Sequence, residues 1–118
     1  MSFRPHRLAE EIKREVTDML QVELNDPRIC KLTSITDVEV SRDLRYAKVF
    51  VSVYGTEQEQ SQTLVGLQSA GGFIRMELGK RIRLRFLPEL TFSLDPSIKR
   101  GIELTHLISE VMDKEIGD

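Results

Sequence analysis

Residues 46–59 read YAKVFVSVYGTEQE, which predicts a strand running directly into the start of a helix. Alanine and valine occupy every second position from Ala47 to Val53, a pattern typical of a strand with one apolar face. Thr56 and Glu59 have the spacing of a capping box, in which a hydroxyl and a carboxylate satisfy free amides in the first turn of a helix. We therefore expect a strand and a helix in immediate succession.

Two more elements are predicted upstream of this stretch. Apolar residues recur at the spacing of an amphipathic helix near residues 5–24, and the sequence Asn25-Asp26-Pro27 ends the pattern. Residues 32–40 are rich in β-formers and lead into a turn at 41–44. We expect this run to form an antiparallel hairpin with the strand that follows it.

The helix after the capping box reaches two adjacent glycines, Gly71 and Gly72, which follow Ala70. A glycine inside a helix costs about 1 kcal/mol relative to alanine, so this pair predicts a kink or break. Apolar residues resume at i+4 steps from Ile74 to Ile82, which predicts a second helix beyond the kink. We interpret the glycines as serving kink geometry and close helix packing. A kink would also expose amides at the start of the second helix, a favourable place for a phosphate.

Residues 83–94 alternate again and predict a third strand, with Arg83 and Arg85 on one face. Pro88 lacks an amide donor, so the ladder is interrupted there or lies at an edge. The sequence Asp-Pro-Ser at 95–97 offers a cap and a first-turn proline for a last helix. The order is then α-β-β-α-kink-α-β-α. A long helical crossover favours parallel pairing of the second and third strands, so we expect an α+β fold with a three-stranded mixed sheet and helices on one face.

Length and composition indicate one globular domain spanning residues 1–118. Hydrophobic residues make up 40% of the 118 residues and charged residues 31%, which suits a packed core and argues against disorder. No uncharged stretch reaches the roughly 20 apolar residues of a membrane span, and the N-terminus lacks the apolar region of a secretory signal. We expect a cytoplasmic protein in which the single cysteine, Cys30, is reduced.

The charges are unevenly distributed along a chain whose net charge is only −2. Residues 70–86 hold five basic residues against one acidic residue, whereas residues 101–118 hold one basic residue against five acidic ones. A small domain with one basic and one acidic pole can bind a polyanion locally while its net charge stays near zero.

Five cations in the basic segment are candidates for contacts with RNA phosphates, because guanidinium groups suit bidentate phosphate binding. They are Arg75, Lys80, Arg81, Arg83 and Arg85. The charge pattern alone leaves a second interpretation open, in which these are solvated charges that complement a helix C-terminus. The aromatic residues Tyr46, Phe50 and Tyr54 share one strand face, where they could stack on bases or pack beneath a helix.

Catalysis is not expected from this inventory of residues. His6 and His106 have no cysteine near them in the sequence, and the adjacent pair Glu10-Glu11 would point about 100° apart on a helix. No glycine-rich phosphate loop or nucleophile elbow occurs. We expect no enzyme activity, no metal, no cofactor and no small-molecule substrate.

Several strings, in order, resemble the bacterial ribosome-binding factor A family. They are LRYAKVFVSV at 44–53, AGG at 70–72, RMELGK at 75–80, and LRFLPELTF at 84–92 followed by Asp95. The opening from Arg4 to Leu20, followed by Asp26-Pro27-Arg28, is also similar. Together these features cover almost the whole chain.

This resemblance implies a type-II KH-like fold and a role as an assembly factor of the small ribosomal subunit. It implies binding to the free or immature 30S subunit and its 16S rRNA during late maturation, with roles in rRNA end processing and cold adaptation. Arg45 and Lys48 lie inside a matching string and join the expected RNA contacts, and we expect a monomer. The GxxG loop of general KH domains, which clamps single-stranded backbone, is absent, and the sequence at that hinge is Ala70-Gly71-Gly72.

Two other functions stay open on the residues alone. The first is a protein-interaction module that uses an acidic last helix and the apolar hairpin edge. The second is a general KH-type chaperone of RNA, which the absent GxxG loop disfavours. Steep salt dependence of binding would favour an RNA partner, because counterion release scales with the number of phosphates contacted.

Overall fold

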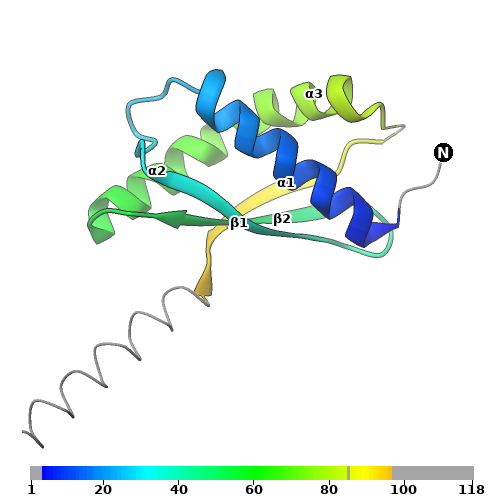
Figure 1. Cartoon of the computed structure of the whole chain (residues 1–118), viewed down its shortest axis with the longest axis horizontal. Helices are drawn as coiled ribbons and strands as arrows, with labels where there is room; N and C mark the ends of the chain where they lie inside the picture. The colour runs from blue at the N-terminus through cyan, green and yellow to red at the C-terminus, as the bar shows by residue number, and fades with distance from the viewer. Residues whose placement is uncertain (1–3, 85, 97–118) are drawn as a thin grey trace, which may run out of the picture.

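The computed structural model describes residues 4–84 and 86–96 and contains three helices and three strands in this range (Figure 1). The elements in order are α1 (Pro5–Val22), β1 (Thr33–Val40), β2 (Tyr46–Val53), α2 (Glu57–Ser69), α3 (Gly71–Ile82) and β3 (Glu89–Leu94). Helix α1 ends two residues before its predicted boundary, at Val22. The predicted last helix lies outside the described residues.

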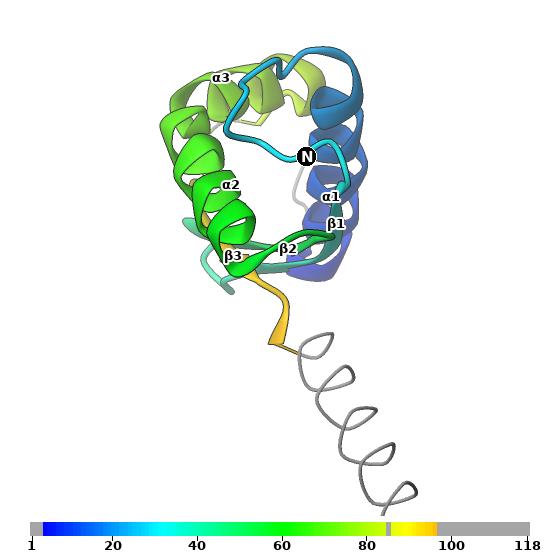
Figure 2. The ribbon, with the colours of Figure 1, turned by 90° about the vertical axis from the view of Figure 1, so that its left-hand side faces the viewer.

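The sheet is mixed, with strand order β1-β2-β3. Strands β1 and β2 pair antiparallel, with Thr33 opposite Val53, and β2 and β3 pair parallel, with Tyr46 opposite Glu89. All three helices cover one face of this sheet (Figure 1; the view along the sheet is in Figure 2). The predicted α+β fold with helices on one face is therefore confirmed.

The apolar face of β2 is the centre of the core. Val49 and Val51 are fully buried, as are Ile12 on α1, Leu67 on α2 and Ile74 on α3. Each of these residues lies on the face that its strand or helix periodicity predicts. The capping box is also present, because Thr56 Oγ1 accepts the amide of Glu59 at 3.1 Å and the Glu59 carboxylate accepts the amide of Thr56 at 3.0 Å.

The other face of β2 is uncovered within the described part of the chain. Tyr46 is 57% exposed and Tyr54 is 80% exposed, at the two ends of this face. Of the two interpretations of the aromatic residues, packing beneath a helix does not hold for α1, α2 or α3, because all three lie on the opposite side of the sheet (Figure 2).

The third strand is shorter than predicted and begins at Glu89. Helix α3 continues to Ile82, and Arg83 ends it in the left-handed conformation (φ 57°, ψ 50°) with its amide bonded to Gly79 O at 3.2 Å. The prediction that Arg83 and Arg85 share one strand face is therefore wrong. Arg83 caps a helix, and Arg85 lies outside the described residues.

The predicted hinge is present, but its predicted close packing is wrong. Ala70 (φ −83°, ψ −2°) separates α2 from α3, and a Cβ atom placed on Gly71 or Gly72 would meet nothing within 4 Å. Close packing occurs instead at Gly66, where a Cβ atom would lie 2.8 Å from Ile29 Cγ1. The backbone at Gly71 and Gly72 therefore has open space beside it.

Candidate nucleic-acid interface

Two segments that are far apart in the sequence meet at one end of the sheet. Because β2 and β3 are parallel, the turn 41–45 and the loop 83–88 both enter the sheet at this end (Figure 1). The amide of Glu89 donates a 2.7 Å hydrogen bond to the carbonyl of Arg45. The exposed arginines here, which define what we call the basic end, are Arg42, Arg45 and Arg83.

The turn 41–45 is held by its own polar groups. Asp43 Oδ1 accepts the hydroxyl of Ser41 at 2.6 Å and the amide of Arg45 at 3.1 Å, and these two hydrogen bonds lower the pKa of the Asp43 carboxyl. Leu44 has a positive φ of 62°, which a non-glycine residue adopts only where its surroundings fix it. Arg42 and Arg45 are therefore carried on an ordered turn.

The loop 83–88 is braced against α3. The guanidinium of Arg75 donates to Leu87 O at 2.9 Å, and the Leu87 side chain lies over Gly79, where a Cβ atom would come within 2.7 Å of Leu87 Cδ2. Pro88 is fully buried. The end of the loop that leads into β3 is thus fixed, through Leu87 and Pro88.

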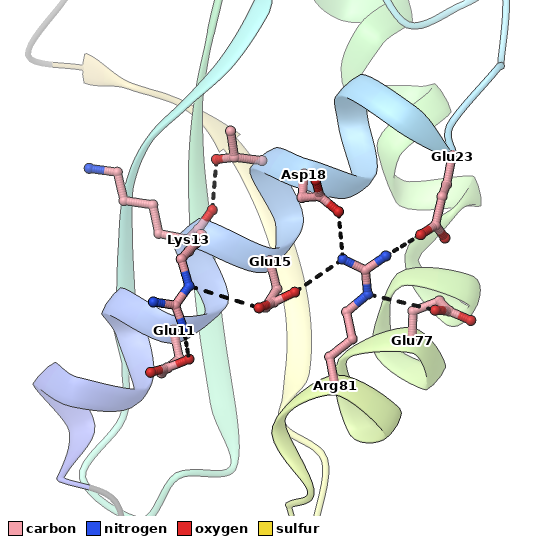
Figure 3. A network of polar contacts seen from close by, with 9 residues as sticks. Glu11, Lys13, Glu15, Asp18, Glu23, Glu77 and Arg81 are labelled. Atoms are coloured by element: carbon pink, nitrogen blue, oxygen red, sulfur yellow. Dashed lines mark hydrogen bonds and ion pairs between the residues drawn. The ribbon is translucent and has the colours of Figure 1, made fainter.

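Arg81 is placed differently from the other predicted contacts. Its guanidinium lies among four carboxylates, those of Glu15, Asp18, Glu23 and Glu77 (Figure 3). Nη1 lies 2.8 Å from the Asp18 carboxylate and 3.0 Å from that of Glu15, and these hydrogen bonds raise the pKa of Arg81. Its side chain is 21% exposed. We call this group of five residues the clamp, because it joins α1 and the segment after it to α3.

The two predicted lysines lie on different faces of the molecule, and only Lys80 adjoins the clamp. Lys48 is on the uncovered sheet face, with its Nζ 5.2 Å from the centre of the Phe50 ring and Glu39 opposite it on β1. Lys80 is exposed on α3 and lies 3.5 Å from a carboxylate oxygen of Glu77. Both ammonium groups are accessible from solvent.

The structure therefore divides the predicted contacts into groups. Arg45 is on the turn that enters β2, Arg83 ends α3 ahead of the loop that enters β3 at the same end of the sheet, and Arg75 braces that loop. Arg81 faces α1 and is held by carboxylates. No geometry is described for Arg85.

Arg42 of the basic end and Phe86 of the loop 83–88 were not among the predicted contacts. The alternation in residues 83–94 predicts Phe86 on the strand face opposite Arg83 and Arg85. Phe86 is instead 78% exposed. Pro88 was the available signal, because a proline in the register of that apolar face breaks the ladder and makes a loop before it.

The kink differs electrostatically from the basic end. A shallow hollow of about 500 Å³ lies beside it, lined in part by Ala70 and Phe73 and in part by the carboxylates of Glu23 and Asp26. Hydrogen bonds from Arg28 lower the pKa of Asp26, so this carboxyl is ionised at neutral pH. The residues that line this hollow include two acidic ones and no basic one, which makes it a poorer phosphate site than the basic end.

Two features are absent from residues 4–84 and 86–96. None of the helices there combines the length and apolar character that a membrane crossing needs. No group of three or more histidine, cysteine, aspartate or glutamate side chains in that range is arranged to hold a metal ion.

Comparison with known proteins gives a consistent result. The family model described as ribosome-binding factor A matches residues 4–108. Ribosome-binding factor A of Caldanaerobacter subterraneus subsp. tengcongensis is 50% identical over 118 residues, which is 100% of this chain and 96% of that protein.

Solved structures agree with the sequence comparison. The crystal structure of ribosome-binding factor A from Thermus thermophilus superposes with a TM-score of 0.68 at 28% identity, over 78% of this chain and 97% of that one. A Thermus thermophilus homology model fitted into a cryo-EM map of a 30S–RbfA complex gives a TM-score of 0.63 at 29% identity, over 75% and 92%. With its family model and a full-length relative both matched, this chain belongs to the ribosome-binding factor A family.

Proposed function

We propose that this chain binds the small (30S) ribosomal subunit in the cytoplasm through its 16S rRNA and acts, without catalysis and as a monomer, in late maturation. We expect loss of this protein to impair rRNA end processing and growth at low temperature. Membership of the family supports this proposal, and so does the relative that was fitted into a map of a 30S–RbfA complex. The observation that carries the proposed site is the parallel pairing of β2 and β3, which brings the segments that carry Arg45 and Arg83 to one end of the sheet.

The basic end suits phosphate binding because its arginines are exposed while the backbone beneath them is fixed. Guanidinium groups bind phosphate oxygens in pairs, and an ordered turn or loop loses little further entropy on binding. We assign the phosphate contacts to Arg45, Lys48, Arg75, Lys80, Arg83 and Arg85. Arg81 is assigned to the fold, because four carboxylates already surround it.

The acidic side of the molecule supports one orientation on RNA. The clamp holds four carboxylates around a single guanidinium, so its net charge is negative and it repels a polyanion. The basic end therefore faces the rRNA, and the carboxylates that α1 contributes to the clamp face away from it. Bare backbone at Gly71 and Gly72 is a second, weaker contact in this proposal, because open space there admits a close approach.

The test is binding of the purified chain to free 30S subunits across a salt series. We expect the double variant Arg45→Glu, Arg83→Glu to lose binding at moderate salt, and each lost phosphate contact to reduce the slope of log K against log salt by about 0.7–0.9. Lys31→Glu is the matched control, since Lys31 is also exposed but lies in the connection between α1 and β1.

Two results would contradict the proposal. A folded double variant that binds as tightly as the wild type would remove the basic end from the interface. Binding that does not change with salt would favour the alternative function, a module that recognises a protein of the subunit.

A further inference from the structure

We infer that the hollow beside the kink binds a segment of a partner protein in which cations and apolar side chains alternate. A lysine or arginine of this segment packs its aliphatic chain against Phe73 and directs its charge to Glu23 and Asp26. This inference goes beyond the proposed function, because it concerns a second surface of the molecule and a protein in place of RNA.

The shape of this surface is the first observation. The end of α1 lies beside the junction of α2 and α3 (Figure 1). The hollow of about 500 Å³ at this place is lined by residues 23–27 together with Ala70 and Phe73. Its volume lies within the range of about 300–1,000 Å³ that is typical of ligand sites. Gly71 and Gly72 are not among the residues that line it, so the hollow is separate from the bare backbone of the kink.

Exposed apolar side chains are the second observation. Phe73 is 44% exposed, and Met76, which follows it by three residues on α3, is 58% exposed. Residues at this spacing are neighbours on a helix surface, so the two form an apolar strip that begins at the hollow. Leu24, Pro27 and Ala70 add apolar atoms to the lining. Contiguous apolar surface marks interaction sites, in which aromatic and methionine side chains are enriched.

Charge is the third observation, and it indicates the kind of partner. Both charged residues that line the hollow, Glu23 and Asp26, are acidic. Arg28 compensates the charge of Asp26, but Glu23 shares Arg81 with three other carboxylates. Negative charge therefore remains at the hollow, where it attracts a cation and repels an RNA phosphate.

A lysine or arginine side chain matches both properties of the hollow. Its methylene groups pack along apolar surface while its charged group stays at the polar edge, and a cation is also attracted to the face of an aromatic ring. The same kind of contact exists within this chain, because the Nζ atom of Lys48 lies 5.2 Å from the centre of the Phe50 ring. Lys80, at the end of the strip beyond Met76, lies 3.5 Å from a carboxylate oxygen of Glu77.

The test is an NMR titration of the full isotope-labelled chain with short, blocked peptides of equal length. One peptide alternates arginine with leucine, one alternates arginine with serine, and one alternates glutamate with leucine. We expect the arginine–leucine peptide to shift the amide signals of residues 23–26, Ala70 and Phe73. The arginine–serine peptide should bind more weakly, and the glutamate–leucine peptide should leave these signals unchanged.

Two pairs of variants separate the apolar contact from the charge. Phe73→Ala should weaken binding of the arginine–leucine peptide about 2- to 30-fold, which corresponds to the loss of one cation–π contact. Tyr54→Ala, which removes a more exposed ring at the end of β2, is its matched control and should bind like the wild type. Asp26→Asn leaves Arg28 uncompensated beside the hollow and should also weaken binding. Its matched control is Glu10→Gln, an exposed position on α1 outside the lining.

Several outcomes would overturn this inference. Wild-type affinity in a folded Phe73→Ala protein, or equal losses in Asp26→Asn and Glu10→Gln, would mean that the peptide binds acidic surface in general. Shifts at the hollow from the glutamate–leucine peptide would favour an acidic occupant such as residues 97–118, which hold five acidic residues and three basic ones. Shifts there from a single-stranded oligouridine would assign the hollow to RNA. None of these results depends on 30S binding, so the inference and the proposed function fail separately.

Discussion

Arg81 and Arg83 are two residues apart, and the surroundings of their side chains differ completely. Arg81 lies on the last turn of α3 within the clamp, where carboxylates from α1, α3 and the segment after α1 converge on it. Arg83 lies just past the end of α3, exposed at the basic end. The comparison shows that an arginine stabilises the fold where the protein's own carboxylates bind its guanidinium. An arginine that is exposed at the surface is available to a partner.

The largest effect that we expect comes from reversing the charge in the clamp. Arg81→Glu would place five carboxylates together without the cation that they share, leaving only Lys80 beside Glu77 and Arg14 beside Glu15. Repulsion should then separate α1 from α3 and lower the melting temperature by several degrees. Arg83→Glu, the matched variant outside the clamp, should melt like the wild type. Thermal unfolding followed by circular dichroism measures both.

The salt dependence of stability gives a second test of the clamp. High salt screens repulsion between partly exposed charges, so it should restore part of the stability that Arg81→Glu loses. A folded Arg81→Glu protein with the wild-type melting temperature at low salt would show that the clamp contributes nothing to the fold.

A smaller effect is expected from adding a methyl group at two glycines. Gly66 is packed against Ile29, whereas Gly72 has open space beside it. Gly66→Ala would bring a methyl group against Ile29, and this overpacking should cost about 1–3 kcal/mol in the free energy of unfolding. Gly72→Ala meets open space within a helix and should instead stabilise the protein by about 0.5–1 kcal/mol. Urea denaturation measures the free energy of unfolding of both variants. If both substitutions changed it in the same direction, the packing assigned to one of the two glycines would be wrong.

Gly72→Ala also probes the second contact of the proposed interface. The added methyl group lies on the bare backbone of the kink, so it should weaken 30S binding if RNA approaches there closely. Unchanged affinity in this more stable variant would confine the interface to the basic end.

The smallest effect concerns the turn of the basic end and its dependence on pH. Hydrogen bonds hold the pKa of Asp43 below its ordinary value of 3.8, so the charged form stabilises the folded state above that value. This stabilisation is lost as the pH falls below about 4. Asp43→Asn should therefore lose less stability than the wild type as the pH falls through that range. If the stability of the two proteins depended on pH in the same way, the role of the Asp43 carboxylate would be contradicted.

Local patterns predicted the elements, whereas the placement of the cations depended on contacts between distant residues. The β2 alternation and the capping box at Thr56 and Glu59 are short-range signals, and both are confirmed. The role of Arg81 depends on Glu15 and Asp18, more than 60 residues earlier, and no local pattern records that contact.

The loop 83–88 was misread for a different reason. Leu84 and Phe86 continue the alternation of Leu90 and Phe92, so a period of two runs through a segment that is not a strand. What decides the structure there is the buried Pro88, with Leu87 packed over Gly79. The pattern of polarity cannot distinguish an apolar residue that enters the core from one that is held outside it.

The parallel pairing of β2 and β3 also sets an order of events during folding. Strands β1 and β2 are joined by the five residues 41–45 and can pair locally, but β3 can join only after the chain has formed or crossed α2 and α3. Closing the longer connection costs more entropy, so we expect β3 to dock last. Because one arginine segment precedes β3 and the other precedes β2, a chain still folding holds only half of the basic end. Affinity for RNA would then arise in the final step, and an unfinished chain would not compete for the subunit.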